Sequence, residues 1–274
     1  MAGNQTRRGG WPLPREHGAW MMLYAPLLTG LLAYRVTPLP AALLATVATA
    51  LFFAQNALGL QLRGRAGPDN TRWLTGFVIV GSAAGAGLLF GYGLWRLLPL
   101  AAPAALLFAW QAWQRRQTRR QIDHSTANEL VTAAVMALGA SAAHLAAGHP
   151  WTAAAAVPWV AFALYFGGSV LYVKMRVRDA RSGGDTQARW RHGLACALFH
   201  GGLGITTAGL ALTCWPGSHF GALAGVATGP AILRALFAWL RLDGTMPSLQ
   251  RIGVLEVVFA SWFSLWLAAA LVGL

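Results

Sequence analysis

The chain has 274 residues, of which 56% are hydrophobic and only 11% are charged. Soluble domains carry about a quarter charged residues, so this composition excludes a water-covered globular surface and predicts a multi-pass membrane protein. The formal net charge of +13 would suggest nucleic-acid binding in a soluble protein. Arginine-rich loops on one side of a lipid bilayer explain the charge equally well, and we expect no nucleic-acid partner.

About nine apolar segments are long enough to cross a bilayer, which takes about 20 residues. No linker or change in composition separates them, so we expect one all-α transmembrane domain over residues 1–274, with a polar cytoplasmic tail at 1–13. Both cysteines fall in or at the end of one segment, which argues against a disulfide scaffold. The predicted spans are 18–36, 39–62, 73–92, 94–114, 127–147, 151–175, 192–213, 219–240 and 252–273.

The loops between these spans alternate between two kinds. One set is short and contains only Arg35 and Arg96 as basic residues. The other set is rich in arginine, which predicts a cytoplasmic N-terminus and an external C-terminus. All eight acidic residues also fall on the arginine-rich side. They are either ordinary solvated loop charges or a mixed-charge cap over a cavity that opens to the cytoplasm.

A polar motif, Pro14-Arg15-Glu16-His17-Gly18-Ala19-Trp20, leads into the first apolar run. It resembles the opening signature of the YwiC-like family of bacterial membrane proteins, which implies a multi-pass protein of the bacterial plasma membrane. Glu16 suits the positive end of a helix dipole. Alternatively Arg15, Glu16 and His17 reach the cytoplasmic cavity and bind an anion or move a proton, so we take them as candidate substrate-binding residues.

The end of the sixth span has the richest polar sequence. Asp179 and Asp185 provide oxygen ligands for a hard cation such as magnesium. Lys174, Arg176 and Arg178 can bind phosphate. The alternative is a positively charged helix end with snorkelling side chains and two balancing acids. Both interpretations stay open.

The topology also resembles that of the UbiA-type prenyltransferase superfamily. Asn56 near the end of span two, and Tyr172 with Asp179 at the end of span six, match parts of its two motifs. The resemblance implies substrate-binding roles for Asn56 and Tyr172, and metal-binding, catalytic roles for Asp179 and Asp185 with magnesium. The aspartates of the first motif are absent, and other residues stand in their places: Ala57, Leu60 and Gly64.

Further polar residues lie within the spans. The stretch Thr126–Glu129 predicts a capping box at the start of a helix. Glu256 lies about one turn into the last span. It is either an acid at the helix start that forms a salt bridge or a carboxylate that binds substrate in a cavity. His144 and His200 are expected to bond neighbouring helices; a shared haem requires matching depths, which their positions do not provide.

Two functions follow. The first is a UbiA-like enzyme, or its degenerate descendant, that binds an isoprenoid or lipid diphosphate at the cytoplasmic face; a reaction there would be a prenyltransferase-like transfer with electrostatic assistance to diphosphate departure. The second is a transporter or accessory membrane protein without covalent chemistry. Pro158 and Pro230 are then candidates for the broken helices of transporters.

Overall fold

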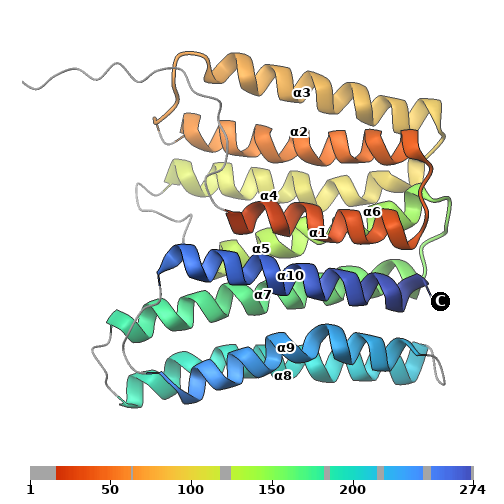
Figure 1. Ribbon diagram of the computed structural model, residues 1–274. Coiled ribbons are helices and arrows are strands. Elements are labelled where there is room, and N and C mark those ends of the chain that lie inside the picture. Colours follow the sequence, from red (N-terminus) through yellow and green to blue (C-terminus); the bar gives the residue numbers. More distant parts are fainter. Residues whose placement is uncertain are drawn as a thin grey trace, which may run out of the picture. The chain divides into compact units, whose positions relative to one another are not determined.

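A computed structural model describes the chain in six stretches, and within them it is helical and has no strand. The helices form two compact units (Figure 1). Arg15, Glu16 and Asp185 lie outside the described residues, as does the side chain of His17. The described residues are 17–62, 64–117, 125–181, 186–214, 219–242 and 248–272.

The first unit contains α2 (Pro38–Leu62), α3 (Asn70–Ala86) and α4 (Leu98–Gln117). The helix α3 continues as a π-helical segment at Gly87–Gly91. The small residue Gly81 of α3 faces α2, since a Cβ atom added at Gly81 would lie 3.1 Å from the Ala50 side chain of α2. Gly81 therefore lets the two helices approach closely.

The second unit contains seven helices, and α7 lies at its centre. The predicted span 127–147 is divided at Ala137 into α5 and α6. Gly139 of α6 lies close to α1, because a Cβ atom added at this glycine would be 3.2 Å from Leu27. The helices are α1 (His17–Ala33), α5 (Thr126–Met136), α6 (Leu138–Ala146), α7 (Ala153–Arg181), α8 (Thr186–Cys214), α9 (Phe220–Leu240) and α10 (Leu249–Val272).

Each of the nine predicted spans falls on a helical segment, which confirms an all-α polytopic membrane protein. Within the described residues, seven segments are long and apolar enough to cross a membrane. The helix α1 is a shorter apolar helix, and α4 is not among the seven. The seven are Pro38–Leu62, Asn70–Gly91, Thr126–Ala146, Ala153–Arg181, Gly193–Leu210, Phe220–Leu240 and Gln250–Val272.

Two details of the prediction need correction. The residues after 175, predicted as a loop, are the last turns of α7, because no helix-breaking residue occurs before Gly183-Gly184. At 29 residues, α7 is about 44 Å long, which exceeds a hydrocarbon core of about 30 Å. In addition, Pro158 and Pro230 do not break α7 and α9, which continue through them.

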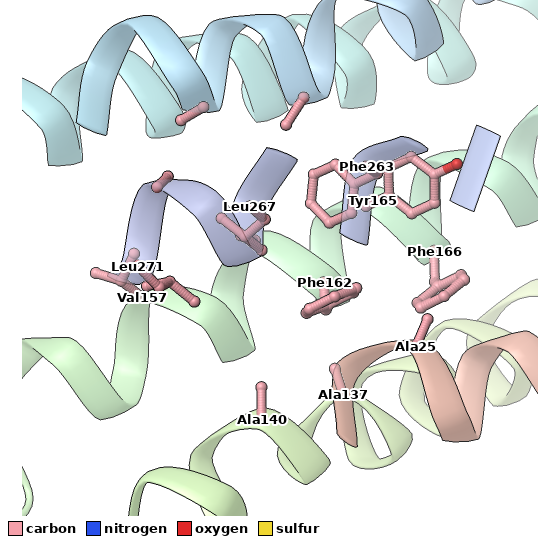
Figure 2. Packing of buried hydrophobic residues seen from close by; sticks show 14 of the residues in the cluster. Ala25, Ala137, Ala140, Val157, Phe162, Tyr165, Phe166, Phe263, Leu267 and Leu271 are labelled. Carbon is pink, nitrogen blue, oxygen red and sulfur yellow. The ribbon is translucent and has the colours of Figure 1, made fainter. Parts of the chain in front are cut away.

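The core of the second unit is aromatic at its centre and lined with alanine. The ring of Phe263 on α10 stacks on Tyr165 of α7 at 4.2 Å between centroids and meets Phe162 edge-on at 5.1 Å. Ala25, Ala137 and other alanines fill the spaces around these rings (Figure 2). This packing fixes one face of α7 against α10. Beyond Tyr165, polar side chains follow along α7.

The contact between α1 and α6 is the tightest backbone approach in this core. A Cβ atom added at Gly30 would lie 2.7 Å from the Cβ atom of Ala143 and 2.8 Å from the carbonyl oxygen of Ala140. Membrane helices associate through such small residues because the lipid removes any hydrophobic drive between them. Only glycine therefore fits at position 30 without moving α1 away from α6.

We expect Gly30→Ala to lower the thermal stability of the detergent-purified protein, because overpacking costs about 1–3 kcal/mol. Gly201→Ala in α8 is the matched control, since nothing lies within 4 Å of the added Cβ atom; its melting temperature should stay the same or rise slightly with helix propensity. Equal melting temperatures for the two variants would contradict this account of the α1–α6 contact.

Candidate functional site

Polar side chains recur along one face of α7. Tyr165, Ser169, Tyr172, Arg176 and Asp179 are spaced four, three, four and three residues apart, which places them on a single helix face. The face is deeply buried at its far end, since Arg176 is 8% exposed and Asp179 is fully buried. Three of the predicted site residues therefore belong to one continuous polar stripe.

Two further predicted residues of α7 lie beside this stripe. The Nζ atom of Lys174 is 3.0 Å from Oε2 of Glu129 on α5, while Arg178 is exposed. The predicted capping box is wrong in its residues: Ser125 is the N-cap, and its Oγ accepts a hydrogen bond from the backbone N–H of Asn128 at 3.2 Å. Glu129 is thus the ion-pair partner of Lys174.

Apart from Glu256, the remaining predicted site residues lie in the first unit or outside the described residues. Asn56 lies on α2, in the first unit. Arg15, Glu16 and Asp185 fall outside the described residues, and α1 begins at His17. Their proposed roles therefore stay predictions.

Glu256 has a partner that the sequence reading did not identify. It lies about two turns after the start of α10, and its Oε1 is 2.8 Å from Nη2 of Arg234 on α9. Both side chains are only 12% exposed. Ser169 of α7 donates a hydrogen bond to the other carboxylate oxygen, Oε2. The carboxylate therefore ties three helices together within apolar spans.

Two aromatic rings flank the guanidinium group of Arg234. Its Cζ atom lies 4.2 Å from the ring centre of Tyr172 and 4.4 Å from that of Phe259. At these distances the cation is attracted by the π-electrons of both rings. Lysine cannot reproduce this arrangement, because its ammonium group lacks the planar fork of arginine.

The site has more hydrogen-bond donors than acceptors. The Nε and Nη1 atoms of Arg234 and the hydroxyl group of Tyr165 are buried and have no hydrogen-bond partner within the described residues. Figure 2 shows the Tyr165 hydroxyl at the end of its stacked ring. Oε2 of Glu256 accepts from Ser169, whereas Oε1 has no hydrogen-bond partner within the described residues and is in ion-pair contact with Nη2 of Arg234 at 2.8 Å. Because buried donors are costly without acceptors, this arrangement suits an oxygen-rich or anionic ligand.

Cys196 and His200 bring α8 to the same site. Both lie close enough to Arg234 to interact with its charge. His200 is 2% exposed, and its Nδ1 lies 2.8 Å from the carbonyl oxygen of Cys196. A carbonyl can only accept, so Nδ1 carries the proton and, in the neutral ring, Nε2 is an acceptor. A Cβ atom at Gly168 would meet Nε2 at 3.0 Å, so α7 and α8 are in close contact here.

The two intramembrane histidines do not bond neighbouring helices as predicted. His200 bonds within its own helix, and Nε2 of His144 donates to the carbonyl of Pro150 at 3.0 Å, just after α6. In each ring one nitrogen bonds a nearby carbonyl group, while Nδ1 of His144 has no hydrogen-bond partner within the described residues. The part of the chain that the structure describes contains no group of three His, Cys, Asp or Glu side chains placed to hold a metal ion.

Arg234 is the functional candidate that sequence reasoning missed. The signal was present, since it is the one formally charged residue in the predicted span 219–240. Charged residues within transmembrane segments face the bundle interior and mark functional sites by default.

We expect Arg234→Gln and Glu256→Gln each to lower the melting temperature strongly, because removing one partner of a buried ion pair costs about 3–5 kcal/mol. The double variant should recover part of the loss, since two neutral amides leave no uncompensated charge. Thermal unfolding in detergent measures this cycle, with the exposed Arg251→Gln as control. Simple addition of the two losses would contradict a direct pair.

Comparison with known proteins identifies one family that part of the chain resembles. The family described as YwiC-like protein matches residues 13–144, from the N-terminal motif through most of α6. The charged site on α7 to α10 lies beyond the matched residues. No curated protein and no solved structure matches the chain. The matched residues 13–144 include the motif that predicted this family, and over that part the chain is similar to YwiC-like proteins.

Proposed function

We propose that this multi-pass membrane protein binds an amphiphile with an anionic head group, of the isoprenoid or lipid diphosphate class, at the charged site of its second unit. The observation that carries the proposal is the surplus of donors: within the described residues, two buried N–H groups of Arg234 and the hydroxyl group of Tyr165 have no acceptor. Phosphate oxygens form charge-assisted hydrogen bonds with such groups.

The polar stripe of α7 supports a head group with two phosphates. Arg234 lies over the ring of Tyr172, and Arg176 follows on the next turn of the same face, about 5.4 Å further along the axis. Arg178 is exposed near the end of the helix. In this proposal Arg234 is the inner anchor and Arg176 holds the outer phosphate, while Lys174 keeps its bond to Glu129.

In this proposal arginine side chains balance the charge of the head group. Asp179 is buried, and the other predicted magnesium ligand, Asp185, lies outside the described residues, so no step is assigned to the metal. Magnesium, the catalytic roles of Asp179 and Asp185, prenyl transfer and a UbiA-like architecture stay predictions from resemblance.

We expect prenyl diphosphates to raise the melting temperature of the detergent-purified protein, because a ligand that binds only the folded state stabilises it by about 2.7 kcal/mol at a hundred times its dissociation constant. The shift should vanish in Arg234→Lys, which keeps the charge but loses the fork, and persist in Arg251→Gln. Measuring with and without magnesium, and in Asp179→Asn, tests the metal separately. If prenyl diphosphates of every prenyl-chain length leave the melting temperature unchanged, the proposal is wrong.

Transport is the second candidate function. The charged pair of α9 and α10 lies within apolar spans, and such groups also mark solute and proton pathways. The continuity of α7 and α9 through their prolines removes the broken-helix support for this function. If prenyl diphosphates do not bind, transport is tested by measuring solute flux in reconstituted vesicles. The flux is compared between the wild type and Arg234→Lys.

We also propose the plasma membrane as the location, with the N-terminus in the cytoplasm, on the basis of the arginine-rich loops. In a variant with both native cysteines replaced by serine, Trp151→Cys should react with a membrane-impermeant maleimide on intact cells. Ala66→Cys, which lies in an arginine-rich connection, should react only after the cells are opened. The reverse labelling pattern would contradict this orientation.

A further inference from the structure

We infer that Trp262 of α10 is a positioning residue for the anion site at Arg234. Its indole N–H group donates a hydrogen bond to the backbone carbonyl oxygen of Val226 on α9 at 2.9 Å. This bond holds the two helices in the register in which Arg234 meets Glu256. The inference rests on the proposed function, because the register matters for binding only if an anion contacts Arg234.

The carbonyl group of Val226 can accept this bond because of Pro230. In an α-helix each carbonyl group accepts from the N–H group four residues later, and proline has no N–H group to donate. Pro230 lies four residues after Val226, yet α9 continues through it. Within a membrane-spanning helix the freed carbonyl group needs another donor, and Trp262 supplies it from the neighbouring helix.

The same arrangement occurs a second time in this unit. Pro158 of α7 leaves the carbonyl group of Ala154 without its helical donor. The hydroxyl group of Tyr34, which directly follows α1, donates to that oxygen at 2.7 Å. In both places a hydrogen bond between two segments replaces one within a helix, so the prolines join neighbouring helices where a break was predicted.

Two contacts fix the register of α9 against α10. Val226 lies eight residues before Arg234, and Trp262 lies six residues after Glu256, so the contacts follow the order of an antiparallel pair. They are about 12 Å apart along α9, at a rise of 1.5 Å per residue. One contact alone would let α10 slide or rotate about it, whereas two separated contacts prevent both movements.

The register decides which groups of Arg234 are left for a ligand. Its Nη2 atom faces Oε1 of Glu256 at 2.8 Å, and the rings of Tyr172 and Phe259 lie 4.2 and 4.4 Å from its Cζ atom. Phe259 is three residues before Trp262 on α10, so sliding of α10 would move the ring and the carboxylate together. The N–H groups at Nε and Nη1, without a partner within the described residues, would then change direction.

The test measures the affinity for farnesyl diphosphate in Trp262→Phe, which keeps a ring but loses the donor. We expect a loss of about two- to tenfold, which is what one hydrogen bond contributes to an equilibrium constant. The coupling between Arg234 and Glu256, taken from the melting temperatures of the single and double glutamine variants without ligand, should also become smaller.

Trp159→Phe is the matched control. The indole N–H group of Trp159 on α7 donates to the carbonyl oxygen of Ala134 on α5 at 2.8 Å. The substitution therefore removes the same kind of bond between two other helices of the unit. Its affinity for farnesyl diphosphate, and the coupling between Arg234 and Glu256 in its background, should equal those of the wild type.

Pro230→Ala separates positioning from a merely structural role. Alanine returns an N–H group to the carbonyl oxygen of Val226. Added to Trp262→Phe, it should restore the melting temperature but leave the affinity low, because the bond between the helices is still missing. This double variant also decides the matter if Trp262→Phe alone does not fold.

Unchanged affinity or unchanged coupling in Trp262→Phe would overturn the inference. An equal loss in Trp159→Phe, or restored affinity in the double variant, would overturn it as well. If the wild type binds no prenyl diphosphate, the proposed function is wrong. The coupling without ligand then still shows whether Trp262 sets the register.

Discussion

The ion pair between Arg234 and Glu256 is the interaction on which the second unit depends. Two charges placed within apolar spans are stable only when they face each other and when further bonds complete their surroundings. Ser169 supplies one such bond to the carboxylate, and Tyr172 and Phe259 supply π-electron density to the guanidinium. Three helices are thereby held in one register, and α8 is added through Cys196 and His200.

Close packing of small residues makes this register possible. Gly30 brings α1 onto α6, Gly168 brings α7 onto the ring of His200, and alanines surround the stacked rings of Tyr165 and Phe263. In a bilayer such contacts supply the association energy that hydrophobic burial supplies in water. The apolar core thus aligns the polar stripe of α7 with the charges of α9 and α10.

The incomplete hydrogen bonding of the pair connects structure to the proposed function. A site built for stability alone would give every buried donor an acceptor, yet Arg234 and Tyr165 keep donors without one in the described residues. In the proposed function, the oxygens of an anionic head group supply those acceptors.

The sequence by itself determined the helical membrane class and the similarity to YwiC-like proteins, because hydrophobic length and the motif around Arg15-Glu16-His17 are local properties of the chain. It also singled out Glu256, since an acid within an apolar span is conspicuous. The tertiary structure alone decided the partners: Arg234 for Glu256, Glu129 for Lys174, and Ser125 as the helix cap. Local pattern shows that a buried charge needs a partner, but which residue meets it depends on how distant helices pack.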